Sequence, residues 1–338
     1  MKAWRLNAPN SIELADMDSQ PVGKGCVKIK LKYSAVSASD LLLYSGKIPC
    51  DAPLVLGRQG IGMVTEVGEG VKNVIRGDMV AVKPFSACGG CLMCKKGRPS
   101  DCENKIVYGF TEDGFLCDFA VVKAEDVYKL PERIDKKSAL LLEHIDMAIT
   151  TINKLNLEHG EHILINGASY LGIIIAQLAL SYQAVPIVVD VDKDRLAMAE
   201  KYVYYVLDHS SVNVRKKVLS ITGGRMSETV VHVPQCGLPF DQILPLASQN
   251  GRVAVVGWED TADINGVNAA PILNKQLTVM GINGSNNNFS AAINMLVNHT
   301  VKVDFDNLPE VNFLSADTLF KDLSGAQQKF IFSRVVMD

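Results

Sequence analysis

The pattern of apolar and polar positions changes near residue 147. Before that point, short alternating runs such as Val27–Leu31 and Met79–Val82 are separated by Gly, Pro and Asp, which is typical of a β-rich domain. The glycine-rich segment Gly57–Gly70 indicates tightly turned strands. After that point, apolar strand segments alternate with helical periods. This alternation predicts parallel strands joined by crossover helices.

The longest apolar stretch, Ile163–Leu180, is interrupted by Gly167 and Gly172 and contains polar Asn166. It therefore predicts a buried strand, a glycine turn and a helix rather than a membrane span. Near residue 290 the alternation stops. The expected elements after residue 147 are strands Ile163–Ile165, Ile187–Val189, Thr229–Val233 and Arg252–Val256, helices from the glycine turn through Ala179 and over Lys193–Tyr202, and a closing strand Phe330–Met337.

The composition is that of an ordinary globular protein large enough for two domains. The chain has 338 residues, of which 48% are hydrophobic and 21% charged. Its net charge of −3 argues against nucleic acid or an anionic membrane as a partner. Four cysteines without framework spacing (Cys26, Cys50, Cys117 and Cys236) favour a reducing compartment, and no signal segment is recognisable, so a cytoplasmic protein is expected.

The other four cysteines follow the spacing C-x2-C-x2-C-x7-C, at Cys88, Cys91, Cys94 and Cys102. Thiolates held two residues apart by tight turns converge on one centre and make a closed tetrahedral zinc site. The surrounding segment is rich in Gly, Lys and Pro, as expected of a loop organised by a metal. We predict one structural zinc ion per chain, without an open coordination position. Two disulfides or four free thiols are the alternatives.

A dinucleotide site is predicted where strand Ile163–Ile165 meets the following helix. The turn reads Gly167-Ala168-Ser169-Tyr170-Leu171-Gly172. A dinucleotide fold uses three glycines there, for the turn, for close approach of the pyrophosphate and for helix–sheet packing. The first and third are present and the middle one is Ser169. Its backbone N–H can still face a phosphate at the helix start, although its Cβ crowds the approach.

The next strand ends in Asp190, 18 residues past Gly172. A carboxylate at this position accepts hydrogen bonds from an adenosine ribose and repels a 2′-phosphate, so NAD(H) is favoured over NADP(H). Arg195 is nearby, but the carboxylates of Asp192 and Asp194 dilute its attraction for a phosphate. A Rossmann-like domain that binds no nucleotide is the alternative.

The order of these motifs resembles that of the zinc-containing medium-chain alcohol dehydrogenases, and the sorbitol and threonine dehydrogenase branch is most similar. The resemblance covers nearly the whole chain and includes Pro53–Gly57 (PLVLG), Ile61–Val67, Gly77-Asp78, the cysteine motif, the glycine turn and Gly251–Val253. It implies an α/β protein with a GroES-like β-rich catalytic domain (1–146 and 288–338, zinc lobe about 84–104) and a Rossmann doubly wound parallel sheet domain (147–287). Homodimers or homotetramers are implied as well.

The resemblance also locates the positions of a second, catalytic zinc, and most of its ligands are replaced. The family motif C-G-[ST]-D corresponds to Ser37-Ala38-Ser39-Asp40, and G-H-E corresponds to Gly57-Arg58-Gln59. Glu143 alone matches a ligand. A serine hydroxyl is a poor zinc ligand, and an arginine has no lone pair to donate. We therefore expect no catalytic zinc, and a contact between Arg58 and Glu143 instead.

The resulting hypothesis is an NAD(H)-dependent oxidoreductase that acts without a catalytic metal on an alcohol, a carbonyl or an activated double bond. Arg58 would polarise a carbonyl or anchor an anionic small-molecule substrate near the nicotinamide, and Ser39 matches the hydroxyl that relays the alcohol proton. These residues also have alternative roles without catalysis. Ser37 and Ser39 are suited to cap the following helix, and Arg58 is suited to neutralise Glu143. Two other possibilities are a redox-inactive homologue with a binding or structural role and a conventional zinc dehydrogenase.

Overall fold

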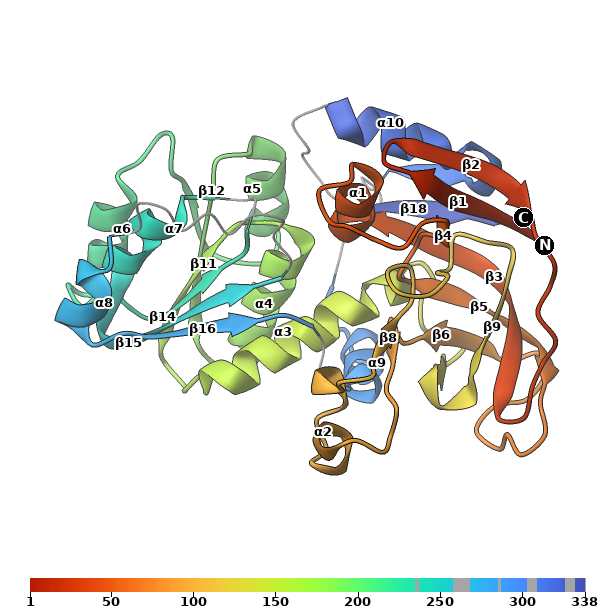
Figure 1. Cartoon of the computed structure of the whole chain (residues 1–338). Coiled ribbons are helices and arrows are strands. Elements are labelled where there is room, and N and C mark those ends of the chain that lie inside the picture. The colour runs from red at the N-terminus through yellow and green to blue at the C-terminus, as the bar shows by residue number, and fades with distance from the viewer. Residues whose placement is uncertain (235–236, 258–267, 285–286, 303–308, 326–331, 338) are drawn as a thin grey trace. The chain divides into compact units, whose positions relative to one another are not determined.

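The computed structural model covers the chain and describes all residues except 235–236, 258–267, 285–286, 303–308, 326–331 and 338. Cys236 falls outside the described residues. The chain forms two compact units. Unit 1 comprises Met1–Glu143, Phe289–Val297 and Phe305–Asp338, and unit 2 comprises His144–Asn288 and Asn298–Asp304. The predicted combination of a β-rich domain and a parallel α/β domain is confirmed (Figure 1).

The main sheet of unit 1 has the strand order β10-β6-β5-β3-β18-β17, and β9 also pairs with β3. Along β3 the side chains of Val27, Ile29 and Leu31 are fully buried at every second position, as the period of a strand requires. The strand predicted over Val27–Leu31 is longer than expected because its second half pairs with β18. The strands are β3 (Cys26–Ser37), β5 (Gly60–Val67), β6 (Met79–Val82), β9 (Phe119–Lys123), β10 (Val127–Lys129), β17 (Glu310–Asn312) and β18 (Phe332–Val336).

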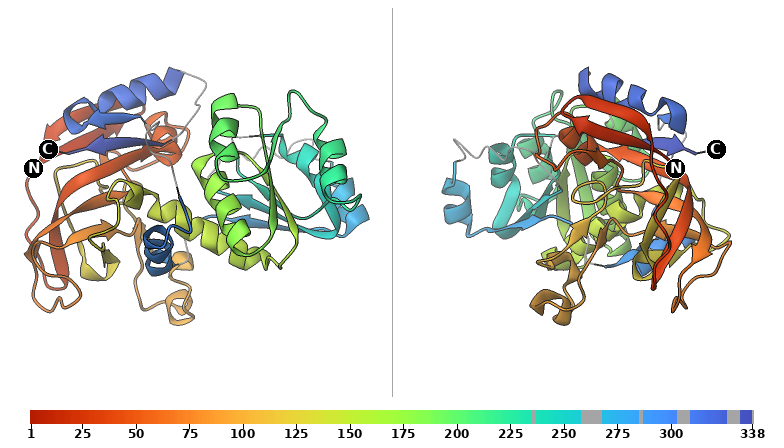
Figure 2. Two further views of the ribbon diagram at one scale, coloured as in Figure 1. Left: turned by 180° about the vertical axis from the view of Figure 1, so that it is seen from behind. Right: turned by 45° about the vertical axis from the view of Figure 1, so that its right-hand side comes forward.

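Smaller elements complete unit 1. They are β1 (Lys2–Ala8), β2 (Ser11–Asp16), β4 (Leu54–Val55), β7 (Phe85–Ser86), β8 (Ile106–Val107), and helices α1 (Ala38–Tyr44), α2 (Leu92–Lys95), α9 (Phe289–Val297) and α10 (Asp317–Gly325). Helix α10 lies beside β1 and β2 (Figure 2). The indole N–H of Trp4 donates to the carbonyl of Phe313 at 2.6 Å, and the rings of Tyr44 and Phe320 pack 5.2 Å apart. The closing strand predicted over Phe330–Met337 is confirmed over Phe332–Val336, where it forms β18. Residues 330 and 331 lie outside the described part of the chain.

Unit 2 is a sheet with the order β13-β12-β11-β14-β15-β16, in which every described pair is parallel. Helices α6, α7 and α8 cover one face through one apolar cluster, and α4 and α5 lie on the other (Figure 1). The four strands predicted here are confirmed, and the helix predicted to end at Tyr202 ends at Glu200. The elements are β11 (His162–Asn166), β12 (Val185–Asp190), β13 (Tyr205–Asp208), β14 (Ser227–His232), β15 (Ala247–Val256), β16 (Thr278–Ile282), α3 (Leu142–Leu155), α4 (Tyr170–Ser181), α5 (Lys193–Glu200), α6 (Val214–Ile221), α7 (Phe240–Ile243) and α8 (Ala270–Lys275).

The unit boundaries differ slightly from the predicted domains. The first boundary lies between Glu143 and His144, three residues before the predicted one. The buried carboxylate of Asp146 accepts hydrogen bonds from the backbone and side chain of Asn288, so both residues belong to unit 2. Residues 298–304, predicted to be part of the first domain, also belong to unit 2. There the side-chain amide of Gln177 makes two 2.8 Å hydrogen bonds with the backbone of Lys302.

No helix in the described part of the chain is long and apolar enough to cross a membrane. The stretch Ile163–Leu180 is divided between β11 and α4, as its glycine interruptions predict. The side chains of Ile163, Leu164 and Ile165 are fully buried within the sheet of unit 2. This apolar stretch is therefore a core element of the parallel sheet and its first crossover helix.

Candidate functional site

The start of α1 places three polar side chains of the predicted site together. Ser37 is the N-cap of this helix, where a hydroxyl and an acid three residues later satisfy unpaired backbone groups. The carboxylate of Asp40 accepts hydrogen bonds from the backbone N–H of Ser37 at 2.8 Å and from its hydroxyl at 2.7 Å. The Ser39 hydroxyl lies 3.0 Å from that of Ser37. The capping role considered for Ser37 is therefore present, and its hydroxyl is committed to Asp40.

The second part of the site is the loop between β4 and β5, which carries Arg58 and Gln59. The loop turns at Gly57, whose φ of 94° is in the region that favours glycine, and an added Cβ there would lie 2.8 Å from the backbone nitrogen of Leu116. The N–H of Gly57 donates to Asp40 at 2.9 Å. The Ser34 hydroxyl donates to the carbonyl of Gln59 at 2.9 Å. These bonds fix the loop backbone relative to α1.

Arg58, Gln59 and Glu143 form a buried hydrogen-bonded cluster. Their exposed fractions are 5%, 6% and 7%. Arg58 Nη2 donates to Glu143 Oε1, and Gln59 Nε2 donates to Glu143 Oε2. Glu143 lies in the first turn of α3, where the helix dipole also favours a carboxylate. The predicted contact between Arg58 and Glu143 is present, and both carboxylate oxygens of Glu143 accept hydrogen bonds from protein donors.

A small cavity opens beside this cluster, with room for about one water-sized group. Arg58, Gln59 and Glu143 supply its polar side chains, and the rest of the lining is apolar or backbone. Gln59 Oε1 is buried and accepts no hydrogen bond from any described residue. The remaining lining residues are Gly60, Ile61, Ala81, Val82, Pro84, Ala139, Leu140, Leu142 and Phe289.

The charges around this site perturb one another. Complete burial raises the pKa of Asp40, although the bonds from Ser37 and Gly57 and the charge of Arg58 oppose the increase. Burial, together with the nearby charge of Arg58, lowers the pKa of Lys105. Burial therefore makes the carboxyl group of Asp40 easier to protonate than an exposed aspartate.

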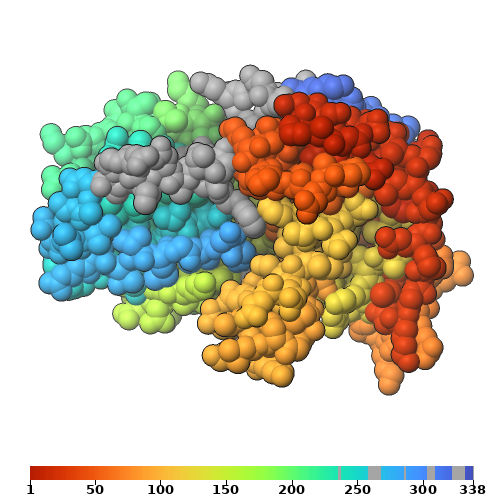
Figure 3. Space-filling model, viewed as in Figure 1, coloured from red at the N-terminus to blue at the C-terminus, as the bar shows by residue number. Residues whose placement is uncertain are grey.

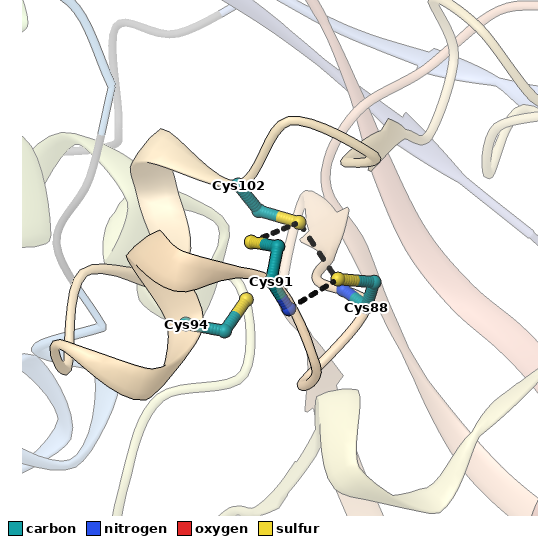
Figure 4. Close-up of side chains that lie close together, drawn as sticks. All are labelled: Cys88, Cys91, Cys94 and Cys102. Atoms are coloured by element: carbon teal, nitrogen blue, oxygen red, sulfur yellow. Dashed lines mark hydrogen bonds between the residues drawn. The ribbon is translucent and has the colours of Figure 1, made fainter.

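The four motif cysteines converge, as the spacing predicts. Their sulfur atoms all lie within 4.8 Å of one another, and Figure 4 shows all four side chains turned toward one centre. The backbone N–H of Cys88 donates to the sulfur of Cys102 at 3.3 Å, and that of Cys91 donates to Cys88 at 3.3 Å. The segment lies at the surface, in amber in Figure 3. The cysteines of the described part of the chain form no disulfide.

This sulfur set fits a zinc ion. Backbone N–H groups of Cys94 and Glu103 lower the pKa of Cys91 to about 6. Desolvation and hydrogen bonding to the neighbouring thiols raise the pKa of Cys94 to about 12. Four thiols this close do not all ionise unaided, whereas a bound dication stabilises all four as thiolates. With four protein ligands, such an ion holds the loop and has no position for a substrate.

The glycine turn of unit 2 also has the geometry that the motif predicts. Gly167 has a φ of 113°, and a Cβ added at Gly172 would lie 2.0 Å from the carbonyl oxygen of Gly167. Ser169 caps α4 by accepting from the N–H of Gly172 at 3.3 Å, with an ordinary φ of −66°. Tyr170 and Leu171 form the first turn, where backbone N–H groups and the helix dipole suit a phosphate. The fold therefore accommodates the serine without strain.

Asp190 is more heavily engaged than its predicted ribose role requires. It is fully buried and receives hydrogen bonds from the backbone N–H groups of Ala168, Val191 and Asp192 at 2.7, 2.7 and 3.0 Å. Arg195 adds a bidentate pair at 3.0 and 2.7 Å. Although burial opposes it, these donors hold the pKa of Asp190 below its usual value. Asp190 thus ties the glycine turn to the start of α5.

The structure brings together Ser37 with Ser39, Arg58 with Glu143, the four cysteines, and Asp190 with Arg195. It also adds two residues to which the sequence reasoning gave no part in the catalytic cluster: Gln59, the second donor to Glu143, and Asp40, the acceptor of the Ser37 hydroxyl. The signal for Gln59 was its position next to Arg58 in the altered G-H-E motif. The signal for Asp40 was its spacing of three residues from Ser37.

Comparison with known proteins supports this description. The family model for the alcohol dehydrogenase GroES-like domain matches residues 23–132, and the one for zinc-binding dehydrogenase matches residues 171–298. The L-threonine 3-dehydrogenase of Pyrococcus furiosus is 31% identical over 281 residues, 80% of this chain and 79% of its own.

Solved structures show the same fold. A zinc-binding dehydrogenase from Sinorhizobium meliloti 1021, solved with NADP, has a TM-score of 0.91 at 20% identity and covers 99% of this chain and 98% of its own. An alcohol dehydrogenase from Escherichia coli CFT073, solved with NADH, has a TM-score of 0.88 at 23% identity over 99% of both chains. Fold and sequence together define a dehydrogenase of two domains. The chain belongs to the zinc-type medium-chain alcohol dehydrogenase family and is an oxidoreductase.

Proposed function

We propose that the chain is an NAD(H)-dependent oxidoreductase in which Arg58, held by Glu143, takes the place of a catalytic metal ion. The observation that carries this proposal is the buried cluster of Arg58, Gln59 and Glu143 at positions where the family resemblance locates zinc ligands. A guanidinium is permanently charged and donates hydrogen bonds in fixed directions. It can therefore stabilise a negatively charged oxygen without any metal.

The same positions are poorly suited to zinc. The hydroxyl of Ser37 donates to Asp40, so its proton is retained in this arrangement. Arg58 offers no lone pair, and its charge repels a dication. Both carboxylate oxygens of Glu143 already accept hydrogen bonds. A zinc ion would have to displace Arg58 and Gln59 from Glu143 and would then find one good ligand.

The nicotinamide cofactor, when bound, donates or accepts the hydride. The residues of this chain then handle charge and the proton. Arg58 stabilises negative charge on the substrate oxygen during transfer. Because the proton of the Ser37 hydroxyl is directed at Asp40, the Ser39 hydroxyl donates toward Ser37 and keeps its lone pairs for the substrate. In the oxidation of an alcohol, the proton would pass from Ser39 to Ser37 and on to Asp40, whose pKa burial raises.

NAD(H) is favoured over NADP(H) by the engagement of Arg195. A 2′-phosphate needs a free cation beside the second strand. The guanidinium of Arg195 makes two hydrogen bonds to Asp190, and its backbone N–H donates to Asp192 at 3.0 Å. The surrounding carboxylates of Asp190, Asp192 and Asp194 add repulsion. The family includes neighbours solved with either cofactor, so a direct measurement on this chain is required.

Two measurements test the proposal. Titration of the purified protein with NADH and NADPH, followed by nicotinamide fluorescence, is expected to give saturable binding that is tighter for NADH. Metal analysis of the same sample is expected to give one zinc per chain. Two zinc ions per chain, or no binding at millimolar cofactor, would contradict it.

A variant then tests the role of Arg58. Arg58→Ala is expected to abolish reduction of carbonyl substrates while leaving NADH affinity unchanged. Arg76→Ala, which removes an exposed arginine of the same unit, is the matched control and should leave both unchanged. Full turnover by Arg58→Ala would show that Arg58 only neutralises Glu143.

A further inference from the structure

Two neighbouring strands at the centre of the sheet of unit 2 end in polar residues, β11 in Asn166 and β14 in His232. The chain runs from β11 outward to β13, returns to β14 and continues to β16, so the strand order reverses between β11 and β14 (Figure 1). Doubly wound sheets bind their ligands beyond the carboxyl ends of the strands at this point. Asn166 and His232 are paired in register there, and the glycine turn begins at Gly167, directly after Asn166.

The side-chain amide of Asn166 joins β11 to the segment that follows β14. Asn166 is fully buried, its Nδ2 donates to the carbonyl of Leu238 at 2.8 Å, and its Oδ1 accepts from the N–H of Leu238 at 2.7 Å. Because a carbonyl only accepts and an N–H only donates, these two bonds fix which amide atom is the oxygen. The amide thus exchanges with Leu238 the same pair of hydrogen bonds that a neighbouring strand would make.

His232 holds the amide in this orientation. The Nδ2 of Asn166 lies 2.8 Å from Nδ1 of His232. Since an amide nitrogen can only donate, Nδ1 accepts, and the proton of the neutral ring is on Nε2. The ring is 7% exposed and lies 5.7 Å from that of Phe240, and burial lowers its pKa to about 4. His232 is therefore a neutral acceptor at pH 7.

Gly237 shows how closely the segment after β14 approaches the glycine turn. Its φ of 72° is in the region that favours glycine, and an added Cβ would collide with the side-chain oxygen of Asn166 and lie 3.0 Å from the backbone nitrogen of Gly167. The N–H of Gly167 donates to the carbonyl of Val189, in β12, at 2.8 Å. The start of the glycine turn is thus held from one side by β12. On the other side the amide of Asn166 sets the separation.

We propose that Asn166 is a positioning residue for the dinucleotide. By tying Leu238 to the end of β11, it holds the glycine turn and the segment after β14 at the separation that the bound cofactor needs. Without this tie, the two segments would have to be ordered as the cofactor binds, and that ordering would reduce the affinity. This role rests on the nicotinamide cofactor of the proposed function. It extends that function to a residue outside both the glycine motif and the Arg58 cluster.

Calorimetric titration with NADH and with ADP-ribose, which lacks the nicotinamide, tests this role at a temperature where every variant is folded. Asn166→Leu keeps the size of the side chain, removes its hydrogen bonds, and is expected to raise Kd about tenfold for both ligands, because they share the pyrophosphate. His232→Phe removes only the bond at Nδ1 and is expected to raise Kd about threefold. Asn153→Leu, which replaces an exposed asparagine of the same unit, is the matched control and should leave both constants unchanged.

The outcomes separate this role from the proposed function. Wild-type affinity in both variants, with only the melting temperature lowered, would overturn the positioning role and leave Asn166 a purely structural residue. A loss for NADH that ADP-ribose does not share would also overturn it, since the loss would then lie at the nicotinamide. Absence of binding to the wild-type protein would overturn the proposed function together with this role. Should Asn166→Leu fail to fold, His232→Phe decides, because it retains both hydrogen bonds to Leu238.

Discussion

Replacing Asp190 by Asn is the perturbation whose consequences follow most directly from the structure. The substitution keeps the shape of the side chain and removes its charge. Asp190 accepts from three backbone N–H groups and twice from Arg195. An asparagine at this position turns an N–H₂ group toward at least one of those donors. It also leaves the guanidinium of Arg195, 7% exposed, without its carboxylate.

The expected loss of stability comes from the charge of Arg195, which the substitution leaves buried without its carboxylate partner. Removing one partner of a buried ion pair typically destabilises a protein by about 3–5 kcal/mol. For a unit of this size, that corresponds to a decrease in Tm of roughly 10 °C. The pair Asp190→Asn with Arg195→Leu should be less destabilised than Asp190→Asn alone, because it buries no unpaired charge. Release of Arg195 in the single variant should also shift the ratio of NADH to NADPH affinity toward NADPH.

Calorimetric melting and cofactor titration of wild type, both variants and the control Asp241→Asn provide the assay. Asp241 is exposed and carries the same charge in the first turn of α7. An unchanged Tm for Asp190→Asn would refute the view that this carboxylate holds the glycine turn. Retained stability with a selective loss of NADH affinity would show that Asp190 serves the ribose instead of the fold.

Three further outcomes are expected. Removal of zinc with a chelator should loosen the cysteine lobe so that trypsin cleaves after the exposed residues Lys95 and Lys96, whereas the metal-loaded protein resists; equal cleavage of both forms would contradict a structural zinc. Joint replacement Ser37→Cys and Arg58→His should raise the zinc content from one to two per chain, and a content of one would show that the former ligand positions do not converge. Burial lowers the pKa of His232 from 6.5 to about 4, so the neutral ring is favoured in the fold. Protonation of the unfolded state should therefore cost on the order of 3 kcal/mol of stability as the pH falls from 6.5 to 4, a loss that urea unfolding of His232→Gln should not show.

The sequence was sufficient for the parts of this protein that depend on local spacing. Four cysteines within 15 residues can converge only through the turns between them, so the motif predicts their cluster without knowledge of the remaining chain. The alternation of buried strands and helices likewise predicts the parallel sheet of unit 2, and Gly167 and Gly172 predict the turn into α4. Such features are set by residues close in sequence, whose geometry the backbone itself limits.

The pair of Arg58 and Glu143 needed more than spacing. These residues are separated by 85 positions, and only the family resemblance suggested that they meet. The same resemblance gave domain boundaries that differ by a few residues from the bounds of the two compact units. The hydrogen bonds of Asp146 with Asn288 and of Gln177 with Lys302 lie within unit 2.

Only the tertiary structure decided how the polar groups are shared. The sequence offered Asp190 as a ribose acceptor, but burial and five donors give it a structural engagement that no spacing rule predicts. It offered Gln59 merely as the residue in place of a family glutamate, whereas in the fold its amide nitrogen donates to Glu143 and its Oε1 is buried. Each hydrogen-bonding group can satisfy a limited number of partners. Which partners reach it depends on the packing of segments far apart in the chain, and that information exists only in the folded protein.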